Sequence, residues 1–497
     1  MVKDNRRILW NTILSLALQV TTVICGFILP RSFLEHYGSD VNGLTQSIAQ
    51  FLSIISFLEL GVGQVIQSSL YTPLASGDTE NVSKMLKSGT NYFRKIACTI
   101  IGYVIILGVF SPYIFGDKYE LTYTITLILI MGIGSFAQYY FGLIDKILLA
   151  ADERGYAQYG VTIIVQIINV VVVLYFIQQG SSIQIVKLIS ALIFLLIPIF
   201  VRIYVNKNYK IDRKIKYDED PIKQKWSGIA QHVSSVVLEG TDVVILTIFS
   251  TLSNVSIYSV YYMVVSGVRQ LYTAATAGVQ SKIGKLWAKG EQQIITDVFQ
   301  GVEVILHFAV VFLFSCIAIL VVPFVQVYTY GITDCNYIQP VFAMVLTLAY
   351  AIRSLRTPYN IMVLAASHYK QTQTCHIIAA ILNIVISIVA VMIWGLVGIA
   401  IGTLVAFVFQ TAWIMIYTSK HLLNRSIIKI IQLVAVDLLA VVLIYVSTFW
   451  ISMREISYLG WFLMAVCVAG IAFLVITILA IVFYFPRLKT LIRALKK

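Results

Sequence analysis

Long apolar stretches separated by short polar connections follow one another along almost the whole chain. Windows of about 20 residues, the length of helix that crosses a bilayer, predict fourteen membrane-spanning helices. Stretches such as 191–201 (ALIFLLIPIFV) are continuous and not alternating, so the pattern indicates helices and excludes a transmembrane β-barrel. The predicted spans lie near residues 9–30, 42–66, 94–114, 121–145, 157–178, 183–205, 227–250, 255–280, 299–323, 339–366, 374–393, 395–418, 430–452 and 458–484.

The composition narrows the class of protein further. Hydrophobic residues make up 59% of the 497 residues and charged residues only 12%, and the mean hydropathy is +0.87. Such a chain has little material for a water-soluble domain, which excludes a soluble enzyme with one anchor. The six cysteines are scattered without metal-ligand spacing, and no nucleotide-binding loop or catalytic motif is present, so we expect neither an enzyme nor a bound cofactor.

The net charge of +13 reflects how Lys and Arg are distributed between the two sides of the predicted spans. With the N-terminus inside, 29 of the 36 Lys and Arg residues fall in segments on the inner side of the predicted spans. Because short cytoplasmic loops collect Lys and Arg, this asymmetry places both termini in the cytoplasm. We therefore expect attraction to membrane lipids and no nucleic-acid partner.

An internal repeat divides the chain. Short matches recur in order at an offset of about 211 to 215 residues, so that spans one to six correspond to spans seven to twelve. The matches pair 74–78 (LASGD) with 287–291 (WAKGE), Pro112 with Pro323, 149–151 with 364–366, and 168–170 with 382–384. The predicted organisation is an N-lobe at 1–206, a cytoplasmic linker at 207–226, a C-lobe at 227–418, two further spans within 430–484 and a basic tail at 485–497.

Two six-helix lobes with two extra spans, together with several short motifs, resemble a known group of transporters. The motifs are Pro30-Arg31, 37–44 (YGSDVNGL), 57–63 (FLELGVG), 70–74 (LYTPL), 241–246 (TDVVIL) and 255–261 (VSIYSVY). They are similar to those of bacterial O-antigen and capsular repeat-unit flippases of the multidrug/oligosaccharidyl-lipid/polysaccharide (MOP) exporter superfamily. The resemblance implies a lipid-linked oligosaccharide as substrate, the bacterial cytoplasmic membrane as location, and a glycan polymerase and glycosyltransferases as partners.

Three arginines lie inside predicted spans, where an unpaired charge is costly and is a functional candidate by default. Arg269 is near the middle of its span, and Arg353 and Arg356 are three residues apart, before a kink expected at Thr357-Pro358. Guanidinium groups offer paired donors and a permanent charge, so a cationic lining that meets a diphosphate is one interpretation. The other is that these arginines pair with Glu239 and Asp242 and only hold the lobes together. Arg31, in the first motif, joins the substrate-binding candidates.

The acids of the spans are candidates for ion coupling. Glu59, Glu239 and Asp242 lie deep in predicted spans, where a carboxylate can bind a proton or Na⁺, although each could equally serve in an ion pair or in helix packing. Asp437 stands alone outside the repeat and is expected to have a satisfied polar role, and His307 is expected to be interfacial.

Polar stripes on the first two spans suit either sugar hydroxyls or hydrogen bonds between helices. They include Gln19, Gln46 and Gln50, which we carry as candidates for contact with sugar.

The sequence thus predicts an all-helical flippase that moves a polyprenyl-diphosphate-linked oligosaccharide across the membrane by alternating access. One alternative is a cation-coupled drug or small-molecule antiporter of the same superfamily, for which an acidic cavity would be expected. A glycopolymer polymerase or transferase is a further alternative, but the longest outer loop, near 324–338, is short for such chemistry.

The charge asymmetry generates a test of topology. Cysteines placed at Gly116 or Thr333 should react with a membrane-impermeant reagent in intact cells, whereas cysteines at Tyr217 or Ser419 should be spared. Reaction of a cysteine at Tyr217 from outside the cell would contradict the whole arrangement.

Overall fold

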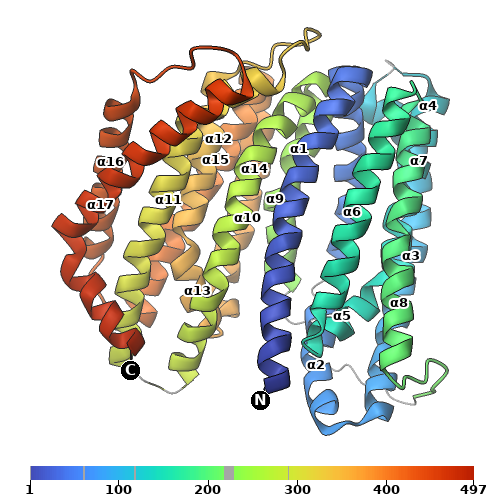
Figure 1. Ribbon diagram of the computed structural model, residues 1–497, viewed down its shortest axis with the longest axis horizontal. Coiled ribbons are helices and arrows are strands. Elements are labelled where there is room, and N and C mark those ends of the chain that lie inside the picture. Colours follow the sequence, from blue (N-terminus) through green and yellow to red (C-terminus); the bar gives the residue numbers. More distant parts are fainter. Residues whose placement is uncertain are drawn as a thin grey trace. The chain divides into compact units, whose positions relative to one another are not determined.

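The computed structural model describes residues 2–59, 62–116, 119–217, 229–288, 290 and 292–496, and its regular structure in these ranges is entirely helical (Figure 1). The prediction of an all-helical membrane protein is confirmed. Two compact units emerge: residues 1–236 with 251–256, and residues 237–250 with 257–497. Much of the predicted linker, at 218–226, lies outside the described ranges.

The first unit begins with one long bent element, whose two halves are separate helical legs. α1 (Val2–Ser53) is interrupted at Gly38, whose φ of 81° falls where residues with a Cβ are strained, so two helical legs meet there. These legs correspond to the first two predicted spans. The other elements are η1 (Ile54–Glu59), α2 (Val62–Ser76), α3 (Thr79–Phe115), α4 (Leu121–Ala137), η2 (Gln138–Gly142), α5 (Leu143–Ala151), α6 (Gly155–Gln178), α7 (Ile183–Phe194) and α8 (Leu196–Asn208).

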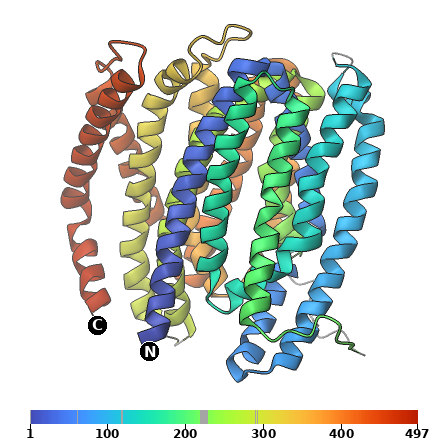
Figure 2. The same ribbon diagram turned by 45° about the vertical axis from the view of Figure 1, so that its right-hand side comes forward.

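Local chemistry sets where these helices begin and how they pair. Asp78 caps α3 by accepting a 3.0 Å hydrogen bond from the backbone N–H of Asn81, and this bond lowers the pKa of the Asp78 carboxyl. Asn11 of α1 caps the start of α6 by accepting from the N–H of Tyr156 at 2.6 Å, and Figures 1 and 2 show α1 and α6 side by side.

The second unit consists of longer helices. They are α9 (Ile229–Phe249), α10 (Leu252–Ala288), α11 (Gln292–Tyr328), α12 (Pro340–Leu355), α13 (Thr357–Ala365), α14 (Tyr369–Trp394), α15 (Leu396–Tyr417), η3 (Thr418–Leu422), α16 (Ile428–Thr448) and α17 (Tyr458–Lys496). The predicted basic tail therefore begins inside α17. Gly398 and Gly402 allow α14 and α15 to approach closely. A Cβ at Gly398 would clash with the backbone of Ala390, and a Cβ at Gly402 would clash with Ser387.

Ten helices in the described ranges are long and apolar enough to cross a membrane. One of them is the bent α1 with both of its legs. α9, α10, α12 and α13 are not among the ten, although the predicted spans 227–250, 255–280 and 339–366 coincide with them. These are the helices that carry the candidate glutamate, aspartate and arginines.

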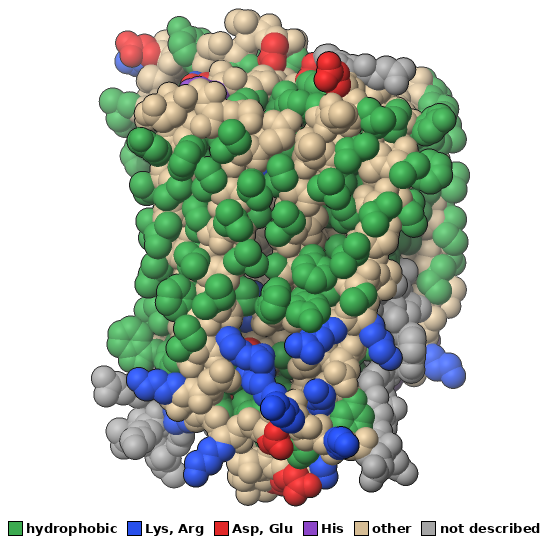
Figure 3. All heavy atoms as spheres, turned by 90° about the vertical axis from the view of Figure 1, so that its right-hand side faces the viewer, with side chains coloured by type: hydrophobic (Ala, Val, Ile, Leu, Met, Phe, Trp, Pro, Cys, Tyr) green, Lys and Arg blue, Asp and Glu red, His purple; other side chains and the backbone are tan. Residues whose placement is uncertain are grey.

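The surface of the first unit has the distribution expected of a membrane protein. Figure 3 shows a broad band of hydrophobic side chains, with Lys and Arg gathered at the end where α3 begins and α8 ends. Exposed residues of that end include Lys95 and Lys207. Within the second unit Ser419 is buried, so the exposed neighbour Lys420 is the better position for the inner-side label.

Two buried polar pairs join α16 and the segment before it to α11. His307 of α11 lies 2.7 Å from Asp437 of α16, which gives the lone aspartate a polar partner. Arg425, just before α16, makes a two-armed ion pair with Glu303 of α11, with one arm at 2.7 Å. The side chains of Arg425 and Glu303 are only 4% and 2% exposed. Apolar contacts of Phe308, Leu433, Ala472 and Tyr484 surround these pairs.

This ion pair generates a stability prediction. Arg425→Met should lower the thermal unfolding temperature of the purified protein, because loss of one partner of a buried pair costs about 3–5 kcal/mol. The double variant Glu303→Leu with Arg425→Met should recover most of that loss, since no uncompensated charge remains. A double variant as unstable as the single one would contradict this account.

Candidate functional site

The candidate arginines are held on three helical segments of the second unit. Arg269 lies on α10, Arg353 lies in the last turn of α12, and Arg356 occupies the break between α12 and α13. The break has a local cause, because Pro358 near the start of α13 cannot continue the hydrogen-bond ladder of α12. The kink expected at Thr357-Pro358 is therefore present.

Arg353 and Arg269 share one carboxylate. The guanidinium group of Arg353 donates to Oε1 of Glu239 on α9, and Nη1 of Arg269 lies 3.6 Å from the same oxygen. Both guanidinium carbons stand 6.0 Å from the ring centre of Tyr350, and that of Arg353 is 5.1 Å from the ring of Phe407. Aromatic faces thus contribute to stabilising the cations.

The cluster formed by Arg269, Arg353 and Glu239 is accessible. Their side chains are 20%, 15% and 42% exposed, respectively. Because an ionised side chain facing lipid would be costly, this exposure indicates a side of the second unit that contacts water or substrate and not hydrocarbon.

Arg356 is in different surroundings. The residue is buried, and its Nε and Nη1 atoms have no hydrogen-bond partner in the described part of the chain. Arg356 is thus buried whereas Arg353 is partly exposed, although the two were expected on one face.

Asp242 does not join the arginines. It is buried, its Oδ2 accepts hydrogen bonds from Tyr258 at 2.9 Å and from Thr403 at 2.8 Å, and Asn383 donates to Thr403 at 3.1 Å. Ser387 lies one turn from Asn383 on α14, and its buried Oγ has no partner in the described residues. Asp242, Tyr258, Thr403 and Asn383 are called the Asp242 cluster below.

The Asp242 cluster combines one carboxylate with neutral oxygen atoms, and no described Lys or Arg forms an ion pair with it. Hard cations prefer such oxygen ligands. In the described part of the chain, no group of three or more His, Cys, Asp or Glu could hold a metal ion. A single negative charge among neutral oxygens suits a monovalent cation or a proton better than a divalent metal.

The sequence reasoning had missed most of this cluster. Thr403 and Tyr258 were not candidates, because hydroxyl groups are common in spans and only their hydrogen bonds to Asp242 distinguish them. Two signals were available, the motif 255–261 that contains Tyr258 and the repeat match that contains Asn383.

The candidates of the first unit mostly contact residues that were not candidates. Arg31 pairs with Glu35 at 2.7 Å, and Glu59 is hydrogen-bonded to the hydroxyl of Tyr139. Gln50 donates to Ser53 at 2.8 Å, Gln46 is half-buried, and Oε1 of Gln19 is buried without a partner in the described chain. Some residues of the same stripe bond between helices, as Thr22 does with Gln166 at 3.2 Å.

No protein-family model matches the sequence, and no curated protein does. Solved structures do match. The chain is similar to the lipid II flippase MurJ in an inward closed conformation, with a TM-score of 0.69, 15% identity, and coverage of 95% of this chain and 98% of that one.

Two further matches are also transporters. One is an inward-facing MATE-family multidrug transporter, with a TM-score of 0.57, 13% identity, and 82% and 98% of the two chains covered. The other is a MOP-superfamily transporter from Pyrococcus furiosus, with a TM-score of 0.58, 13% identity, and 84% and 96% covered. The chain therefore has the fold of MOP-superfamily transporters and is a multi-pass membrane protein.

The Asp242 cluster generates a prediction about ions. Rising Na⁺ at constant ionic strength should raise the unfolding temperature of the purified protein, because a ligand at a hundred times its Kd stabilises the folded state by about 2.7 kcal/mol. Asp242→Asn should abolish this dependence. The matched control is Asp437→Asn, which alters another buried aspartate of the same unit and should leave the response to Na⁺ intact. Equal loss in both variants would contradict a specific site.

Proposed function

We propose that this protein is a flippase for a lipid-linked oligosaccharide carried on a polyprenyl diphosphate. The observation that carries the proposal is the accessible cluster of Arg269, Arg353 and Glu239, with Arg356 buried nearby in the same unit. Similarity to a transporter described as a lipid II flippase supports the same class of substrate.

The charges of the cluster suit a dianion. The two guanidinium groups and one carboxylate of the cluster leave a formal surplus of one positive charge, and the buried Arg356 adds a further cation to the same unit. A diphosphate would supply matching negative charge and paired acceptor oxygens for the planar donors of Arg353 and Arg269. In this proposal Glu239 is the counter-ion when substrate is absent, and the diphosphate competes with it for the two arginines.

The same surplus disfavours the alternative of a drug or cation antiporter, although MATE transporters share the fold. A cationic substrate would be repelled by the positive surplus of the cluster and would need an excess of acids. Gln19, Gln46 and Gln50 of the first unit remain candidates for contact with sugar.

The proposed location is the bacterial cytoplasmic membrane, with both termini inside. Outward movement of an anionic lipid is favoured by an inside-negative potential, by about 2.3 kcal/mol per charge at 100 mV. The Asp242 cluster would add coupling to Na⁺ or H⁺, and Glu59 remains a second candidate for that role. A glycan polymerase and glycosyltransferases would consume and supply the lipid-linked sugar.

The arginines generate a test that separates binding from packing. Arg269→Ala or Arg353→Ala should weaken binding of a polyprenyl-diphosphate-linked sugar to the purified protein about ten- to a hundredfold. A charge-assisted hydrogen bond contributes about 1.5–3 kcal/mol, which corresponds to that range. Both variants should also fail to restore surface glycan in cells that lack the native protein.

Glu239→Gln is the matched control. It breaks the same ion pairs but leaves the cationic surplus, so it should bind the lipid-linked sugar as well as the native protein or better. If Glu239→Gln loses as much binding as Arg353→Ala, the cluster serves packing and the flippase proposal loses its main support.

A further inference from the structure

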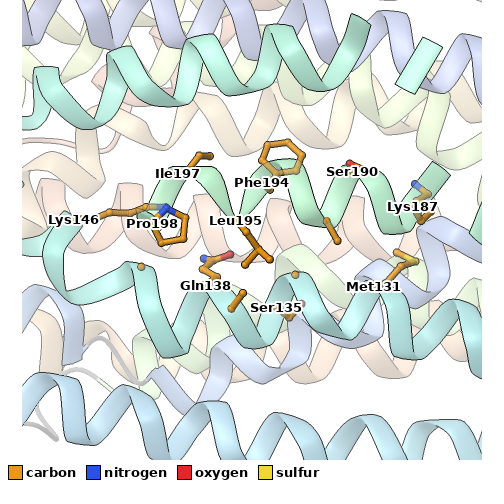
Figure 4. Close-up of a pocket in the computed structure, with 14 residues that line it drawn as sticks. Met131, Ser135, Gln138, Lys146, Lys187, Ser190, Phe194, Leu195, Ile197 and Pro198 are labelled. Atoms are coloured by element: carbon orange, nitrogen blue, oxygen red, sulfur yellow. The ribbon is translucent and has the colours of Figure 1, made fainter. Parts of the chain in front are cut away.

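A groove in the first unit lies apart from the candidate site. It has a volume of about 340 Å³ and runs between α4, η2 and α5 on one side and α7 and α8 on the other (Figure 4). This volume would hold roughly ten water molecules and is within the usual range of ligand sites. No residue that we place in the transport site lines it.

Two lysines mark the ends of the groove. Figure 4 shows Lys146 beside Pro198 at one end and Lys187 near Met131 at the other. From Lys187 to Pro198 the chain advances eleven residues, or about 16 Å of helix. The polar side chains of Ser135, Gln138 and Ser190 lie between the two ends.

Neither lysine forms an ion pair with a described carboxylate. The acid next to Lys146 in the sequence is engaged elsewhere, because Asp145 pairs with Arg202 at 3.1 Å and with Arg213 at 3.0 Å. Lys187 instead stands 4.3 Å above the ring of Phe33. Lys146 is therefore the free cation of the groove.

Two irregularities of the helices coincide at the groove. α4 passes into the π-helical turn η2, a feature that is frequent at functional sites, and this turn carries Gln138 and Gly142. Opposite it, α7 gives way to α8 at Leu195. Gly142 allows close approach there, since a Cβ at that position would lie 3.3 Å from Pro198.

We propose that this groove binds an anionic phospholipid, with its phosphate at Lys146 and an acyl chain along Leu195 and Phe194 towards Lys187. Basic pockets between membrane helices are typical sites for anionic headgroups. The apolar residues between the lysines suit a hydrocarbon chain, and Phe194 is exposed at the groove. In this proposal the phospholipid binds to the first unit and is a different molecule from the substrate proposed for the second unit.

The test measures the thermal stabilisation of the purified full-length protein by phosphatidylglycerol, with phosphatidylcholine as the uncharged comparison. The native protein should respond to phosphatidylglycerol specifically. Lys146→Gln should weaken the apparent affinity about tenfold. The matched control is Lys95→Gln, an exposed lysine on α3, which should leave the response unchanged.

A second variant fills the groove without removing a charge. A Cβ at Gly134 would meet no atom within 4 Å, so Gly134→Leu has room for its side chain and should also reduce the response to phosphatidylglycerol. Arg353→Ala should leave that response intact, which keeps this test independent of the flippase proposal.

Three results would overturn the inference. The first is native-like binding by both Lys146→Gln and Gly134→Leu. The second is equal stabilisation by phosphatidylcholine, and the third is full replacement of the lipid by inorganic phosphate, which would indicate an anion site that recognises no acyl chain.

Discussion

A charged group inside a hydrocarbon layer costs at least about 2.5–3.5 kcal/mol unless it finds a partner or water, and the second unit is arranged around that cost. Its charges come from α9, α10, α12 and the break before α13, which converge so that Glu239 meets Arg353 and Arg269. Tyr350 and Phe407 add aromatic faces to the same cations. The helix break before Pro358 belongs to this arrangement, because Arg353 lies in the last turn of α12 and Arg356 lies in the break itself.

The buried charges of the second unit fall into two kinds. Glu303 and Arg425 are matched one to one, and together with the hydrogen bond of His307 and Asp437 this pair joins α16 to α11, while apolar contacts add α17. The arginine cluster has more cations than carboxylates, and the Asp242 cluster has a carboxylate without a described cationic partner. A charge that already has its partner gains little stabilisation from a ligand, whereas an unpaired charge is stabilised when a ligand of opposite charge binds. We therefore assign structure to the first kind and transport to the second.

Hydrophobic periodicity was enough to predict the helices, because each span must satisfy its backbone hydrogen bonds within itself. The proline itself predicted the kink at Pro358, and the arginines and Glu239 were singled out by their depth inside the predicted spans. Hydrophobic periodicity could not decide the pairing of Asp242, since Thr403 and Tyr258 are close to it only after folding. Nor could it predict the turn at Gly38 that joins two spans in one element, or the groove at Lys146, whose shape depends on the π-helical turn at 138–142.

The charged residues of α9, α10 and α12 have a consequence for biosynthesis. A helix enters the bilayer from the translocation machinery according to its own hydrophobicity, and each Arg or Asp near its centre opposes entry by about 2.5–3.5 kcal/mol. Asp242 on α9, Arg269 on α10 and Arg353 on α12 each carry this cost. Because α10 is made before α12, Glu239 on α9 can gain Arg269 as its first cationic partner and Arg353 as its second. The residues proposed to recognise the substrate thus also set the order in which the second unit can be assembled in the membrane.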